Sequence, residues 1–90
     1  MEIQTQQTEH ITATIRQTLN DLDIEIHPES QTPLTEMAPD SLSLLELLIE
    51  LEDALEIILD PADIKANAKF EDLVTLCATA IAAKTEREAA

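Results

Sequence analysis

The sequence contains no glycine, no tryptophan and no tyrosine, and Phe70 is its one aromatic residue. The absence of glycine removes the residue that the tight turns of β-hairpins favour. Cys77 is the single cysteine, so an internal disulfide and a multi-cysteine metal site are excluded. His10 and His27 stand at no metal-ligand spacing, and no zinc site is expected. Alanine and the aliphatic residues supply nearly all the apolar content, which favours an all-α fold.

Basic residues are also scarce. Five lysine and arginine residues stand against nineteen acids, and the formal net charge is -14. A nucleic acid or an anionic membrane surface would be repelled, so we expect any macromolecular partner to be a basic protein. No apolar run reaches the ~20 residues needed to cross a bilayer, and the first residues lack the basic and apolar regions of a signal peptide. We therefore expect a cytoplasmic protein without membrane insertion. We also expect it to be a monomer.

The length of the chain predicts a single domain. A chain of 90 residues has material for one core, so residues 1–90 are taken as one unit. Apolar residues at helical spacing predict a first helix over residues 8–22 and a last helix over residues 70–84. The proline-containing segment 23–39 is predicted to be a long ordered loop. The tail, residues 85–90, has little to bury and is expected to fray.

A second helix is predicted after the last proline of that loop. Pro39 biases the residue before it away from helical geometry, and Asp40 is a favoured N-cap residue. The helix is therefore expected to begin at Asp40 or Ser41 and to run to about residue 56. The Asp-Pro pair at residues 60–61 repeats the start signal and predicts a short third helix that ends near residue 66 or 67. Asn67 is then the favoured cap of the last helix.

The predicted second helix carries more leucine than one buried face needs. One apolar stripe comprises Leu44, Leu48, Leu51 and Leu55, a second comprises Leu47, Leu51, Ala54 and Ile58, and further angles hold Leu42, Leu45 and Ile49. Some of these side chains are therefore expected to face solvent or a cavity. Several acids lie among them, and no basic residue occurs from residue 40 to residue 63. This pattern indicates a docking surface for a basic partner, although a core helix with a solvated acidic face gives the same charge run.

The start of this helix carries a motif. Asp40-Ser41-Leu42 heads the acidic, leucine-rich helix, and Glu46 follows five residues after the serine. In these residues the chain resembles the acyl carrier proteins, in register over residues 37–59 and more loosely elsewhere. The resemblance implies a small all-α four-helix bundle with three long helices, one short helix and a long loop after the first helix. It also implies a 4'-phosphopantetheine arm on Ser41, attached from coenzyme A by a phosphopantetheinyl transferase, with Asp40 as the motif acid.

The same resemblance implies partner contacts. In that family an acidic surface faces the partner enzymes, and the residues of this chain that match it, or match the apolar contacts beside it, are Glu46, Glu52, Asp53, Leu42 and Ile49. A carrier performs no reaction itself, which agrees with a sequence that has no Ser-His-Asp arrangement or phosphate-binding loop. We therefore expect no enzyme activity, and we expect acyl-transferring or synthase enzymes with basic docking surfaces as partners. The cargo stays open among fatty-acid, polyketide and aminoacyl or peptidyl carriers.

The motif also differs from the family pattern and has a second interpretation. Most members have a glycine where this chain has Ala38-Pro39, and many have an acid where it has Ser43. Serine is common at helix starts as a cap, and Ser43 with Glu46 matches the S-x-x-E capping box. The alternative is a non-catalytic acidic adaptor in which Ser41 only caps the helix.

Overall fold

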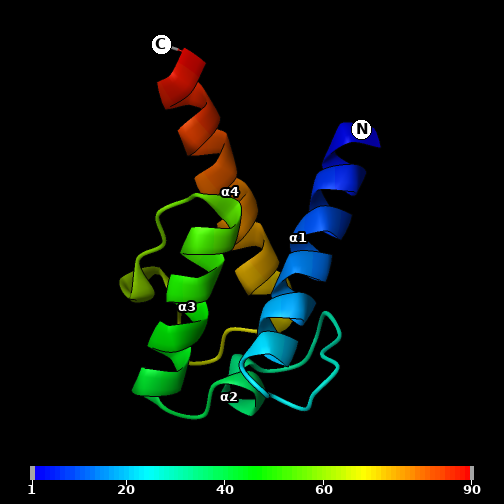
Figure 1. The fold of residues 1–90 in the computed structure, drawn as a ribbon, viewed down its shortest axis with the longest axis vertical. Helices are drawn as coiled ribbons and strands as arrows, with labels where there is room; N and C mark the ends of the chain where they lie inside the picture. Colours follow the sequence, from blue (N-terminus) through cyan, green and yellow to red (C-terminus); the bar gives the residue numbers. More distant parts are fainter. Residues whose placement is uncertain (1, 90) are drawn as a thin grey trace.

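The fold consists of helices. The computed structural model describes the backbone of residues 2–89 and the side chains of residues 7–84. Its elements in chain order are α1 (Glu2–Asp21), α2 (Leu34–Met37), α3 (Ser41–Leu55), η1 (Pro61–Asp63) and α4 (Phe70–Ala89). The long helices α1, α3 and α4 stand together, and α2 lies at the end away from the two termini (Figure 1). No strand occurs in the described backbone. The predicted all-α fold, with three long helices and a long loop after the first, is confirmed.

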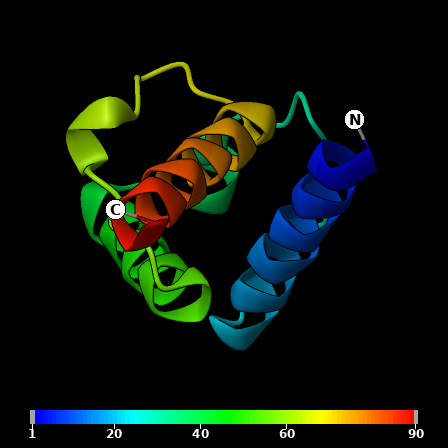
Figure 2. The same cartoon turned by 90° about the horizontal axis from the view of Figure 1, so that it is seen from above.

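The core lies among the three long helices, which Figure 2 shows from above. α1 contributes a stripe of apolar side chains at every fourth residue to the core, and α3 and α4 contribute the side chains that pack against it. Its main buried members are Ile11, Ile15, Leu19, Leu47, Leu48, Leu51, Phe70, Leu73, Val74 and Cys77. Burial raises the pKa of the Cys77 thiol to about 11, so this side chain is a neutral core thiol at physiological pH, as its position on the apolar stripe predicts.

Two helix ends differ from the sequence-based expectation. α1 begins at Glu2, before the expected start at residue 8, because polar residues of good helix propensity continue the helix without an apolar stripe. The backbone of α4 runs to Ala89, past the expected end at Lys84. The expectation that residues 85–90 fray stays a prediction, since the side chains of these residues lie outside the described part of the chain. α3 begins and ends within one residue of its predicted bounds.

The short third helix is smaller than predicted. Asp60 caps it as expected by accepting a hydrogen bond from the Ala62 N–H at 2.9 Å, and Pro61 is its first residue. The helix ends after Asp63 as a single 3-10 turn, and the backbone is extended at Ile64. The predicted end near residue 66 or 67 is therefore wrong. Ile64 is the only large apolar side chain available there, so a longer helix would have had a single contact with the core.

The loop between α1 and α2 is tied to the start of α4. The Phe70 N–H donates to the Thr32 carbonyl at 2.8 Å, and the Leu34 N–H donates to the Ala68 carbonyl at 3.0 Å. Between these two bonds lies an isolated antiparallel bridge between Pro33 and Lys69. We call this connection of residues 30–34 with residues 68–71 the α4 tie. It fixes the chain immediately before α2.

The predicted cap of α4 is also wrong. Lys69, and not Asn67, immediately precedes the helix, and the Lys69 N–H donates to the Asp72 carboxylate at 2.8 Å. The Glu71 N–H in the first turn donates to the Ser30 carbonyl at 3.0 Å. Because the loop supplies acceptors for the first turn, α4 needs no capping side chain at position 67.

α3 ends on a residue in the left-handed conformation. Glu56 has φ 54° and ψ 50°, a region in which glycine avoids the clash that a Cβ introduces. We expect Glu56→Gly to raise the free energy of unfolding by about 0.5–1 kcal/mol, measured by urea titration. Glu50→Gly, which removes another exposed acid from the interior of α3, should lower it by about 1 kcal/mol. A destabilised Glu56→Gly protein would contradict the assigned backbone conformation.

Candidate functional site

The first turn of α3 is capped by Asp40. Its Oδ1 accepts a hydrogen bond from the Ser43 N–H at 2.7 Å, and its backbone is extended, as the N-cap position requires. Ser41 is the first helical residue and is exposed, and its Oγ makes no hydrogen bond to any residue that the structure describes. Ser43 lies inside the first turn. The interpretations of Ser41 as the cap, and of Ser43 with Glu46 as a capping box, are therefore wrong.

Hydrogen bonds hold the Asp40 carboxylate in its charged form. The Ser43 N–H, and after it the Ser43 hydroxyl, lower the pKa of Asp40 below the ordinary value for an aspartate. The positive end of the α3 dipole acts in the same direction. Asp40, the motif acid, is therefore an anion at neutral pH, and its carboxylate caps the start of α3.

The Asp40 cap predicts a pH dependence of stability. Because the pKa of folded Asp40 is lowered, its contribution is fully present above the pKa of an unfolded aspartate, about 4, and is lost as the pH falls through the lowered value. In Asp40→Asn, which keeps an acceptor oxygen but does not titrate, we expect Tm to fall less steeply with acid than in wild type. Melts by circular dichroism between about pH 5 and pH 2 measure this slope. A slope in Asp40→Asn equal to that of wild type would contradict the prediction.

Ser41 can accept a phosphodiester without loss of a native contact. Its hydroxyl is exposed and makes no hydrogen bond to the described residues, so an ester bond at Oγ removes no hydrogen bond among them. The start of a helix also favours an anion, because its backbone N–H groups and the helix dipole are positive there. Three buried side chains anchor the segment before Ser41: Leu34, Met37 and Ala38. The residues present therefore fit a phosphopantetheine arm on a fixed base.

Three large apolar side chains of α3 face solvent. Leu42 is 66% exposed, Leu45 is 44% exposed and Ile49 is 50% exposed. Their spacing of three and four residues places them on one side of the helix, and we call them the apolar strip. The expectation that some apolar residues of this helix face solvent is confirmed. Leu45 also belongs to this surface, although the family resemblance did not single it out. The sequence did place Leu45 outside both leucine stripes of the helix, and that position could have indicated its exposure.

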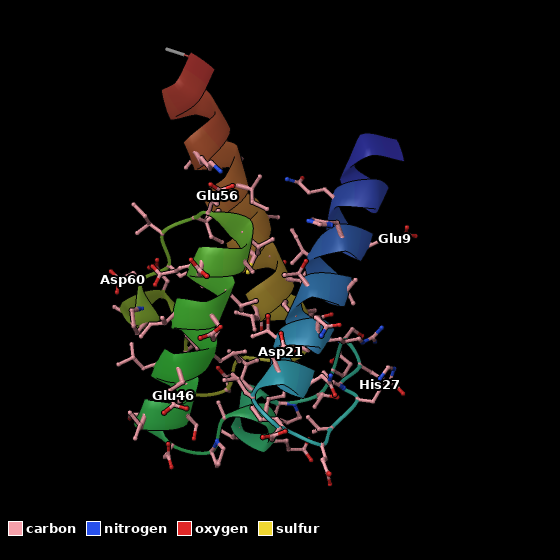
Figure 3. All side chains as sticks on the ribbon, viewed as in Figure 1. Glu9, Asp21, His27, Glu46, Glu56 and Asp60 are labelled. Atoms are coloured by element: carbon pink, nitrogen blue, oxygen red, sulfur yellow. The ribbon has the colours of Figure 1, made fainter. Side chains whose placement is uncertain are left out.

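The acids matched to a docking surface do not all have the same environment. Glu46 and Asp53 are exposed, and Glu46 projects from the half of α3 that begins with Ser41 (Figure 3). Glu50, which the resemblance did not single out, is exposed as well. Glu52 is partly buried, and its Oε2 accepts a hydrogen bond from the Leu59 N–H at 2.9 Å. The Glu52 carboxylate therefore holds the chain that follows α3.

Ile58 lies at the surface and not on a buried stripe. The sequence analysis counts Ile58 in an apolar stripe with Leu47 and Leu51, but α3 ends at Leu55, so the helical stripe does not extend to Ile58. Ile58 is 71% exposed, whereas its neighbours Ile57 and Leu59 are both buried. This alternation is that of an extended segment.

Outside α3, the described polar residues form no metal-binding cluster. Glu9 on α1 and His27 in the loop after α1 lie on the other side of the molecule from α3 (Figure 3). Over the part of the chain that the structure describes, no three His, Cys, Asp or Glu side chains come together in a way that could hold a metal ion. In the same part, no helix has the length and apolar character to cross a membrane.

Comparison with known proteins agrees with this geometry. The chain matches the protein family described as phosphopantetheine attachment site over residues 9–77, which contain the Asp40-Ser41-Leu42 motif and all of α3. No curated protein and no solved structure matches the chain. Members of this family carry a 4'-phosphopantetheine group and are not themselves catalysts. Because the match covers most of the chain, the protein belongs to the phosphopantetheine-attachment family and is a non-catalytic, phosphopantetheine-carrying carrier protein.

Proposed function

We propose that Ser41 carries the 4'-phosphopantetheine arm and that the protein is an acyl carrier protein. The observation that supports this proposal is the Ser41 hydroxyl at the start of α3, which is exposed and has no hydrogen-bond partner in the described part of the chain, while Asp40 supplies the cap. In the transfer, the Ser41 oxygen bonds to the pantetheine-bearing phosphorus of coenzyme A and loses its proton to a base. The pyrophosphate bond of coenzyme A breaks, and adenosine 3',5'-bisphosphate leaves.

The proposed cargo is an acyl group held as a thioester on the terminal thiol of the arm. The Asp-Ser-Leu motif favours an acyl cargo over an aminoacyl or peptidyl one, and a fatty-acid, polyketide or related lipid pathway fits this motif. The arm swings from a fixed base, so the thioester can reach the active sites of separate enzymes while the helices stay in place.

The proposed partners are basic enzymes. Glu46, Glu50 and Asp53 are exposed on α3, and no basic residue from residue 40 to residue 63 neutralises them. A partner with lysine and arginine around its active-site entrance complements this surface and is guided toward Ser41. We place the protein in the cytoplasm, because coenzyme A and the transferase that uses it are available there. We also propose that it acts as a monomer.

Intact-protein mass spectrometry tests the attachment. The apo protein is incubated with coenzyme A, magnesium and a broad-specificity phosphopantetheinyl transferase, and the mass is measured before and after. We expect the gain of a single phosphopantetheine group, located on Ser41 by fragmentation of the peptide that contains it. An unchanged mass, with a control carrier fully modified in the same tube, would overturn the proposal.

A further inference from the structure

One acidic residue organises the turn after α3. The Glu52 carbonyl accepts hydrogen bonds from the Glu56 N–H and, at 3.1 Å, from the Ile57 N–H. The Glu52 carboxylate accepts a third bond from the Leu59 N–H at 2.9 Å. We call this arrangement of Glu52 with residues 56–59 the Glu52 latch. It fixes the path of the backbone from the end of α3 toward η1.

The latch holds an isoleucine in solvent. Ile57 and Leu59 are buried in the core, and the alternation of side chains along the segment turns Ile58 outward. At 71% exposure, Ile58 is the most exposed large apolar side chain in the part of the chain that the structure describes. An inward turn of Ile58 would break the bond between Glu52 and Leu59. The exposure therefore follows from the hydrogen bonding and burial of its neighbours.

The Glu52 latch, which precedes η1 and contains Ile58, adjoins the end of the apolar strip. Glu52 follows Ile49, the last member of the strip, by three residues, so the two are neighbours on α3. Because the Glu52 carboxylate contacts the Leu59 N–H, the latch adjoins this end of the strip. Figure 3 shows Glu56 at the end of α3 and Asp60 in the segment that follows. The exposed acids in the sequence around Ile58 are Asp53, Glu56 and Asp60.

We propose that Ile58 is a second apolar anchor for the phosphopantetheinyl transferase and that Glu52 positions it. This inference rests on the proposed attachment at Ser41. The transferase binds the phosphates of coenzyme A and so presents positive charge, which complements the acids around Ile58. α3 has 15 residues and is about 22 Å long. An interface of standard size, about 800 Å² on each partner, can span that length from Ser41 to the latch.

Steady-state kinetics of the transferase with the full-length apo protein test the proposal. In Ile58→Ser we expect KM for the apo protein to rise about tenfold with kcat unchanged, because the isoleucine no longer contributes its burial to binding. Glu52→Ala, which removes the latch, should raise KM to a similar extent. Glu52→Gln keeps an acceptor oxygen for the Leu59 N–H and should restore a KM near that of wild type. Ala13→Ser, an exposed apolar-to-serine change on α1, is the matched control.

The outcomes separate the anchor, the latch and the attachment. An unchanged KM in Ile58→Ser would overturn the anchor. Equal losses in Glu52→Ala and Glu52→Gln would assign Glu52 to charge contact and overturn its positioning role. Hydrogen exchange of the Leu59 amide should accelerate in Glu52→Ala but not in Glu52→Gln, which reports on the latch independently of the enzyme. A wild-type protein that is not modified defeats the proposed function, whereas modification with normal KM in every variant defeats only this inference.

Discussion

Replacement of Ser41 by alanine should abolish the gain of phosphopantetheine mass and leave the free energy of unfolding within about 0.5 kcal/mol of wild type. The Ser41 hydroxyl is exposed and makes no hydrogen bond to the described residues, so its removal costs the fold no native contact. Alanine also has the highest helix propensity. Intact mass after transferase treatment and urea titration of the same sample measure both effects.

Ser43→Ala is the matched control for that result. The Ser43 hydroxyl helps to hold the Asp40 carboxylate, so its loss should weaken the start of α3 while the attachment oxygen stays in place. We expect Ser43→Ala to be less stable than wild type and still to gain one phosphopantetheine group. Modification of Ser41→Ala together with loss of modification in Ser43→Ala would move the attachment site by two residues.

Leu47→Ala should lower the free energy of unfolding by about 2–5 kcal/mol. Leu47 is completely buried where α3 packs in the core, so its truncation leaves a cavity. That loss is a large share of the total stability of a small domain, about 5–15 kcal/mol, and the variant should be partly unfolded at 37 °C. Urea titration measures the change.

Leu45→Ala is the matched control on the same helix. Leu45 stands two residues before Leu47 but belongs to the apolar strip and is 44% exposed. Its truncation should cost less than about 1 kcal/mol, because little buried apolar area is lost. Equal losses in the two leucine variants would mean that the two faces of α3 are assigned incorrectly.

The features that the sequence predicts well are those set by neighbouring residues. Pro39 and Asp40 define the start of α3 to within one residue, because a proline restriction and a cap are local effects. The same is true of the Asp60 cap of η1. Surplus leucine in α3 likewise predicts exposed apolar residues, since a helix can bury only part of its circumference in one core.

The features that the sequence misses depend on contacts between distant segments. Asn67 is a reasonable cap for α4 by local rules, but the carbonyls of Ser30 and Thr32 satisfy the first turn from a loop far away in the sequence. The family resemblance matches Glu52 to a docking acid, and local rules give no sign of its hydrogen bond to the Leu59 N–H. Its inward bond to Leu59 exists only once the chain has turned at Glu56, a non-glycine residue in a conformation that local rules disfavour.

The α4 tie also sets an order of events during synthesis of the protein on the ribosome. Ser30 and Thr32 emerge long before Phe70 and Glu71, whose N–H groups their carbonyls accept. At about 5–20 residues per second, Ser41 precedes the completed tie by roughly 2–6 s. During that interval the nascent chain contains Ser41, the proposed attachment site, while the segment before α2 lacks the hydrogen bonds of the α4 tie. Because α3 also shares its core with α4, we expect a transferase that recognises folded α3 to act on the finished chain. A messenger that ends before the codon for Phe70 would then encode Ser41 without encoding a substrate.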